Sequence, residues 1–197
     1  MKNIDLHFFF EYYGAAVIDF EIDNQHHKFE STYMGENPLN ALITALWQLT
    51  VKSNTIWINE NGEEETHDKE SYNLIWQNEP WGHTVKLVKD KNILHISITY
   101  FSDTERYNDQ TYSFVDTETV LEVDTNFNDF TSKVCKEAIR ALRKYGFLGY
   151  ARSWDTSYKN EDFPIAKLLY LLGSDCQEKD DDLVLSDFNK ELKMLTS

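Results

Sequence analysis

Three segments near the start of the chain alternate between hydrophobic and polar residues. Residues 4–12 and 17–23 place hydrophobic side chains mainly on one parity, and residues 27–34 repeat the pattern more weakly. A period of two residues is typical of a strand with one buried face. Gly14 and the pair Asp23-Asn24 separate the segments. We therefore predict a hairpin followed by a third strand.

A helix is predicted over residues 38–51. Asn37 can accept a hydrogen bond from an amide of the first turn, and Pro38 lacks only a donor that this turn does not use. Five hydrophobic residues then recur at helical spacing, and they form an apolar stripe that should face the sheet. They are Leu39, Leu42, Ile43, Leu46 and Leu49.

The middle of the chain returns to strand patterns. Residues 55–58 predict a short strand, residues 72–100 an antiparallel meander, and residues 111–123 a long strand rich in Thr, Val, Tyr and Phe. Residues 60–70 are strongly acidic and contain the turn pair Asn61-Gly62, which favours a solvated loop. We expect a mainly antiparallel sheet of about six strands.

The C-terminal third changes to a helical period. Hydrophobic residues recur at helical spacing over 127–145, with Gly146 as the expected stop, and shorter helical patterns cover 164–172 and 186–195. Strands first and helices afterwards indicate an α+β fold, with one inserted helix and C-terminal helices packed on one face of the sheet. We expect a single domain over 1–197.

Within that domain, residues 1–123 are expected to be sheet-rich, with the inserted helix over 38–51, and residues 126–197 to be helical.

The charge of the chain narrows the choice of partner. Asp and Glu number 34 against 19 Lys and Arg, which gives a formal net charge of -15. Nucleic-acid affinity comes largely from Lys and Arg, so we expect no nucleic-acid binding. The acidity can serve solubility, or it can attract a basic protein partner. Outside the strands it concentrates at residues 60–70 and 178–182, where an electrostatic docking surface is expected.

The sequence carries no recognisable signal for export or membrane insertion. Residues 1–14 hold one Lys and a short aromatic run interrupted by acidic residues, without the cleavage site of a leader. A run of about 18 apolar residues, as a spanning helix requires, is missing. Cys135 and Cys176 are too few for a disulfide scaffold and are predicted to be free thiols. We expect a cytoplasmic protein without membrane contact.

Several chemistries lack their characteristic motifs in this sequence. The phosphate-binding patterns GxGxxG and GxxxxGKS/T and the hydrolase pattern GxSxG do not occur. His26 and His27 are adjacent, and neighbours on a strand point to opposite faces, so they do not readily share an ion. The acidic run around His67 could hold a hard cation weakly, although a solvated surface is favoured. We predict no cofactor and no metal.

One candidate binding site lies in the aromatic segment 76–83. Glu79, Trp81 and His83 surround a proline turn between predicted strands, where aromatic side chains can anchor an interface. The structural alternative is that Trp76 belongs to the core and Trp81 covers a sheet edge. With Tyr33, the three residues also form the candidate set for a small-ligand or catalytic site assembled from distant residues.

A second candidate lies in residues 145–154, which connect two predicted helices. Arg152 stands beside Tyr150 and Trp154 in a position suited to a cation-π contact or to binding of a carboxylate. The structural alternative is that this segment fastens the helical layer to the rest of the domain. Arg152 and Trp154 complete the set of candidate binding residues.

Short motifs along most of the chain carry a resemblance to a known group. They are Ser31 to Tyr33, Leu39 to Leu49, Glu79-Pro80, Tyr145-Gly146, Trp154 and Phe163-Pro164. In this order they resemble a widespread group of uncharacterised bacterial proteins, some of them associated with polymorphic-toxin immunity loci. The resemblance brings no catalytic residues with it.

These observations favour a non-enzymatic protein-binding domain over an enzyme without deciding between them. The specific expectation is an immunity-type inhibitor that neutralises a basic effector through its acidic surface, because opposite charge speeds association. The alternative is an enzyme or small-ligand-binding protein whose site is assembled from distant residues. Self-assembly through exposed aromatic residues is a third possibility, and the oligomeric state is not predicted.

Overall fold

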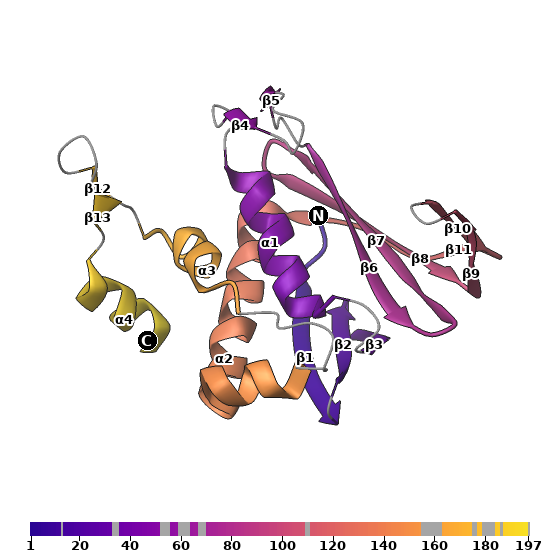
Figure 1. Ribbon diagram of the computed structural model, residues 1–197, viewed down its shortest axis with the longest axis horizontal. Coiled ribbons are helices and arrows are strands. Elements are labelled where there is room, and N and C mark those ends of the chain that lie inside the picture. Colours follow the sequence, from indigo (N-terminus) through magenta and orange to yellow (C-terminus); the bar gives the residue numbers. More distant parts are fainter. Residues whose placement is uncertain are drawn as a thin grey trace.

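Antiparallel sheets and helices share one hydrophobic core in the computed structural model of the chain (Figure 1). The structure describes the backbone of residues 1–12, 14–32, 36–51, 56–58, 64–66, 70–108, 111–154, 163–174, 177–178, 184–185 and 187–196. Its strands are β1 (Ile4–Tyr12), β2 (Ala15–Ile22), β3 (Gln25–Thr32), β4 (Ile56–Ile58), β5 (Glu64–Thr66), β6 (Ser71–Asn78), β7 (Trp81–Asp90), β8 (Ile93–Phe101), β9 (Asp103–Asn108), β10 (Thr111–Val115), β11 (Glu118–Asn126), β12 (Gln177–Glu178) and β13 (Val184–Leu185). Its helices are α1 (Pro38–Thr50), α2 (Phe127–Trp154), α3 (Ile165–Leu171) and α4 (Phe188–Thr196). The predicted α+β class is confirmed.

The first sheet has three strands in the order β1-β2-β3, and both of its pairs are antiparallel. Asp23 and Asn24 form the turn between β2 and β3, and both have positive φ, a conformation that Asp and Asn adopt more readily than most residues. Ile18 and Phe20 on β2 are fully buried, as the alternation requires. The predicted hairpin and third strand are confirmed.

The second sheet has four strands in the order β11-β8-β7-β6, all antiparallel. Strands β9 and β10 form a separate hairpin between the end of β8 and the start of β11. The ring of Phe101, the last residue of β8, lies 4.6 Å from the ring of Phe114 on β10. Asp116 has a φ of 46°, so the single strand predicted over 111–123 is in fact two strands. Residues 64–66, predicted as loop, form β5 and pair with β4.

Helix α1 places its apolar stripe in the core shared by the two sheets. Asn37 caps the helix, since its Oδ1 accepts from the backbone N–H of Leu39 at 3.1 Å and of Asn40 at 3.2 Å. All five stripe residues are at most 5% exposed. At the other end, Nζ of Lys89 donates to the carbonyl of Leu49 at 2.7 Å and so satisfies an unpaired helix carbonyl.

Helix α2 begins directly after β11 and changes direction at Gly146. This glycine has φ 68° and ψ 167°, so the helical geometry stops where the sequence predicts and a further helical segment follows. That segment brings the hydroxyl of Tyr150 to 2.9 Å from Oδ1 of Asn37 and 3.0 Å from Oδ1 of Asn40. The start of α1 is thereby tied to the end of α2.

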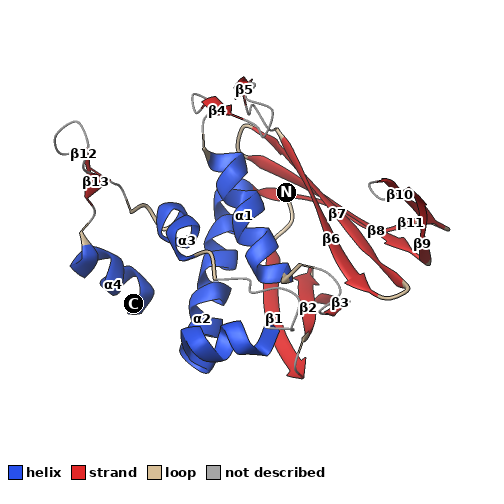
Figure 2. Ribbon diagram, in the orientation of Figure 1, coloured by secondary structure: helices blue, strands red, loops and turns tan. Residues whose placement is uncertain are grey.

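The helices gather on one side of the four-stranded sheet, as Figure 2 shows. Helix α3 contacts both α1 and α2, and α4 contacts α3. In the part of the chain that the structure describes, every helix is too short or too polar to cross a membrane. Cys135 of α2 is buried and makes no disulfide, and burial raises the pKa of its thiol to about 12.

Two junctions connect the sheets. At one, the backbone N–H of Lys2 donates to the carbonyl of Asp124 at 2.9 Å, and Oγ1 of Thr125 donates to the carbonyl of Lys2 at 3.1 Å. At the other, Oγ1 of Thr32 on β3 donates to the carbonyl of Gln77 on β6 at 3.3 Å. The two sheets are therefore held at both sides of the core.

The outer edge of β1 is closed by side chains of α2. Oε2 of Glu137 accepts from the backbone N–H of Phe8 at 3.1 Å, and Nη2 of Arg140 donates to the carbonyl of Phe8 at 2.6 Å. Lys133, one turn earlier, donates to the carbonyl of Ile4. Arg140 and Glu137 also bind each other at 2.7 Å. Side chains one and two turns apart on a helix thus occupy the place of a neighbouring strand.

Replacing Glu137 with Ala should lower the free energy of unfolding by about 2 kcal/mol, because the amide of Phe8 loses its acceptor in a buried position. Lys136→Ala is the matched control, since Lys136 is the exposed neighbour on the same helix, and it should stay within about 0.5 kcal/mol of the parent. Urea unfolding measures both variants. Equal stability of the two would show that the edge contacts of Glu137 do not support the fold.

Candidate functional site

The six sequence-predicted binding residues fall into three groups in the structure. Tyr33 lies outside the described residues. Arg152 and Trp154 belong to the last turn of α2, and their side chains also lie outside what the structure describes. Their roles stay predictions.

The third group lies at the turn between β6 and β7. Glu79 is exposed there and joins Pro80 through a cis peptide bond, Trp81 is half-buried, and His83 is buried. Trp81 and His83 are brought together, whereas Glu79 faces solvent.

His83 is the centre of an aromatic cluster between β3 and the four-stranded sheet. Its ring lies 5.0 Å from the ring of Phe29, 5.7 Å from that of Tyr100 and 5.9 Å from that of Trp81. The contacts with Phe29 and Trp81 are edge-to-face, a favoured arrangement for aromatic rings. The cluster therefore packs β3 onto β7 and β8, as the structural alternative expects for this segment.

The burial of His83 decides its charge. It is 8% exposed, its Nδ1 has no hydrogen-bond partner, and burial lowers its pKa to about 4. The ring is therefore neutral at pH 7. Ser31 Oγ and Trp76 Nε1 are likewise buried without a partner, and Trp76 stands directly opposite His83 in the β6-β7 register.

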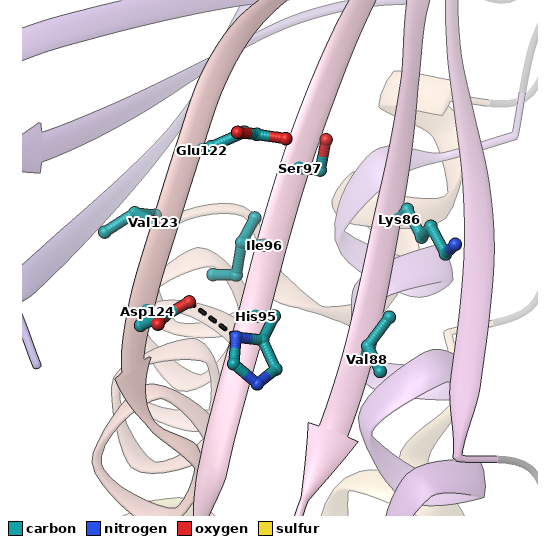
Figure 3. Close-up of a pocket in the computed structure, with 8 residues that line it drawn as sticks. All are labelled: Lys86, Val88, His95, Ile96, Ser97, Glu122, Val123 and Asp124. Carbon is teal, nitrogen blue, oxygen red and sulfur yellow. Dashed lines mark hydrogen bonds and ion pairs between the residues drawn. The ribbon is translucent and has the colours of Figure 1, made fainter.

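A separate hollow of about 400 Å³ lies on the outer face of the four-stranded sheet. Figure 3 shows two rows of side chains that run across β7, β8 and β11. Within each row the three residues stand directly opposite one another in the strand registers. Lys86, Ser97 and Glu122 form one row, and Val88, His95 and Asp124 form the other.

The hydrogen bond between His95 and Asp124 is the shortest polar contact in this hollow. Nδ1 of His95 lies 2.6 Å from Oδ1 of Asp124 (Figure 3), so the carboxylate orients the ring. Among the described residues, no hydrogen bond links the hydroxyl of Ser97 to this pair. The geometry is that of an open polar surface suited to binding, without a nucleophile held against a base.

A second hollow, of about 270 Å³, lies at the end of the three-stranded sheet and is lined by acidic side chains. Asp5 of β1 and Glu21 of β2 stand directly opposite each other in the ladder, and Asp23 follows in the turn. Lys2 binds Asp23 at 2.9 Å. No described cation forms an ion pair with Asp5 or Glu21. Two like charges in directly opposed positions destabilise a sheet, and His26 of β3, which stands on the other side of Glu21 in the register, forms its hydrogen bond with Asp19.

A third hollow, of about 320 Å³, adjoins the first at β11. It is lined by Met1, Lys2, Glu122, Val123 and Asp124, where the N-terminal residues meet β11. Lys2 lines this hollow and binds Asp23 of the second one, so it stands between the acidic side chains of the two sheets. The described residues contain no group of three or more potential metal ligands.

The sequence contains this acidic surface only as the polar half of an alternating strand pattern. Residues 60–70 and 178–182, where acidity concentrates along the sequence, lie largely outside the described residues. Strand pairing brings Asp5 opposite Glu21 and places the row of Glu122 beside the row of Asp124. This pairing is part of the tertiary structure and is not visible in the sequence of any one strand. The sequence signal that indicates such a surface is a run of acidic residues at the solvent-facing positions of two consecutive predicted strands.

Comparison with known proteins adds no relative, because neither a family model, nor a curated protein, nor a solved structure matches the chain.

Gly82 is required by the close packing beside Trp81 and His83. A Cβ atom at this position would lie 2.6 Å from Cζ of Phe101 and 2.6 Å from the carbonyl oxygen of Trp76. Gly82→Ala should therefore lower the free energy of unfolding by about 2 kcal/mol. Gly149→Ala is the control, because a Cβ there meets its neighbour at 3.7 Å and alanine favours a helix, so stability should hold or rise. Urea unfolding that ranks the two variants in the opposite order would contradict this packing.

The buried neutral ring of His83 predicts a pH-dependent stability. Between pH 6.5, its ordinary pKa, and about 4, its folded pKa, the unfolded chain binds a proton that the folded chain does not. The free energy of unfolding should therefore fall as the pH is lowered through this window, by about 3 kcal/mol from this group.

Denaturant unfolding at several pH values, with His83→Gln as the variant and His27→Gln as the control on β3, isolates the contribution of His83. The curve of His83→Gln should be flatter than that of the parent between pH 6.5 and 4, and the curve of His27→Gln should not be. Parallel curves for parent and His83→Gln would show that the ring is protonated in the folded state.

Proposed function

We propose that the chain is a non-enzymatic protein-binding domain that docks a basic partner on the acidic outer faces of its two sheets, in the manner of an immunity-type inhibitor of a basic effector. The observation that carries this proposal is the directly opposed pair Asp5 and Glu21. The pair weakens the free protein and is relieved by a cation supplied from outside.

The surroundings of this pair support the same partner chemistry. Glu122 and Asp124 of β11 are exposed on the outer face of the other sheet and line the hollow beside it. The net charge of -15 adds a long-range field that draws a basic protein toward the domain and increases the association rate more than the affinity.

Removing the like-charge pair tests the proposal, because it should move stability and binding in opposite directions. Asp5→Asn and Glu21→Gln should each raise the free energy of unfolding by about 0.2–1 kcal/mol, since the repulsion across the ladder disappears. The same variants should capture less of the basic partner in a pull-down from the source cell or with the product of an adjacent toxin-like gene, and added salt should weaken capture by the parent.

Glu70→Gln is the matched control, because it removes one exposed charge ahead of β6, the strand farthest from β11 in the sheet order. Glu70→Gln should change both the free energy of unfolding and the amount of captured partner less than Asp5→Asn and Glu21→Gln do. Capture that is insensitive to salt, or a partner bound equally by the parent and by Glu21→Gln, would contradict electrostatic docking at this surface.

A further inference from the structure

The edges of the two main sheets are unequally covered. β1 is closed by the side chains of α2 described above, and β6 is covered by α1 and by the second half of β3. Asn78 at the end of β6 also donates to Oε2 of Glu30 on β3 at 3.0 Å. Unpaired strand edges are templates for another chain, and proteins ordinarily cover them in this way.

Among the described residues, no backbone group binds the edge of β11 that faces away from β8 over residues 118–122. At its far end the carbonyl of Asp124 accepts from the N–H of Lys2, which shows that the backbone groups of Asp124 point toward this edge. Alternate residues of a strand direct their groups to the same edge, so the N–H and C=O of Glu122 also point there. No described residue pairs with Glu122 on this side.

The two faces of β11 carry different side chains, and this difference specifies the sequence of a strand that could pair with its open edge. On the outer face Glu122 and Asp124 are exposed, and on the inner face Leu121 is 9% and Val123 7% exposed at the margin of the core. A strand added at this edge would place alternate residues opposite the carboxylates and the others beside the apolar pair. Its matching sequence alternates Lys or Arg with apolar residues.

Other features of the molecule favour β11 over the remaining edge at the start of β3. The start of β3 carries His26 and Lys28 and has no carboxylate that an added basic strand could bind. Beside β11 lies the hollow of about 320 Å³ lined by Met1, Lys2, Glu122, Val123 and Asp124, which leaves room for an incoming chain and, unlike the start of β3, offers two carboxylates. The β-bulge between Thr119 and Leu121 interrupts the ladder and keeps the open edge short.

We propose that β11 accepts an extended basic segment of the partner protein as an additional strand, held by backbone hydrogen bonds at Glu122 and by alternate Lys or Arg side chains on Glu122 and Asp124. This inference rests on the proposed function, since it assumes a basic partner. It adds the mode of recognition, in which the main chain supplies affinity and the alternating side chains supply specificity.

The test uses a synthetic peptide of roughly strand length in which lysine alternates with valine or threonine, together with the same peptide N-methylated along its backbone. The two peptides carry the same charge, but the methylated one cannot donate backbone hydrogen bonds. The full-length protein should bind the methylated peptide about tenfold more weakly or worse. The unmodified peptide should slow hydrogen exchange at the amide of Glu122, measured by NMR, and leave the exposed amides of β3 unchanged.

Variants of the protein separate charge from strand addition. Glu122→Gln should weaken binding of the unmodified peptide severalfold, and Glu70→Gln should not. Equal binding of the two peptides, or no change in exchange at Glu122, would overturn strand addition and leave electrostatic docking intact. Absence of binding by either peptide would overturn both strand addition and the attraction of this surface for basic chains.

Discussion

The arrangement of the whole molecule depends on how α2 satisfies the outer edge of β1. An edge strand buried beneath a helix has backbone groups that neither water nor a neighbouring strand can reach, and each one left unpaired is costly. Glu137 and Arg140 bind the N–H and C=O of the same residue, Phe8, while also binding each other. The half-exposed guanidinium of Arg140 thus compensates the charge of the buried Glu137 carboxylate at the position where both close the sheet.

The position of α2 in turn sets the position of α1. Because the helix is fixed along β1, the bend at Gly146 directs its final turns back toward the start of α1, where the hydroxyl of Tyr150 reaches Asn37. Asn37 is also the N-cap of α1, so its Oδ1 accepts hydrogen bonds from two backbone amides of the helix and from the hydroxyl of Tyr150. The apolar stripe of α1 then lies against β6 in the shared core in one orientation. A single helix-to-edge contact therefore controls the two layers.

Local signals account for most of the fold that the sequence predicts correctly. The alternation in β1 and β2, the cap at Asn37 and the stop at Gly146 are each decided by residues close together in the chain. The division of the strands into two sheets could not be predicted in this way, because it depends on contacts such as that of Thr32 with Gln77. The break at Asp116 was also missed, since a residue in a left-handed conformation leaves little trace in a hydrophobic pattern.

The candidate site shows the same limit more strongly. His83 and Trp81 were named from their aromatic character, and the structure uses them to pack strands together. The acidic surface instead arises from residues that look ordinary one strand at a time. Asp19, Glu21 and Asp23 read as the solvent side of a strand, and the opposition of Asp5 to Glu21 exists only once β1 and β2 are paired in register. A repulsive contact of this kind costs stability in the free protein, whereas charges placed anywhere on the surface serve solubility, and for this reason the proposed cationic partner is assigned to this pair.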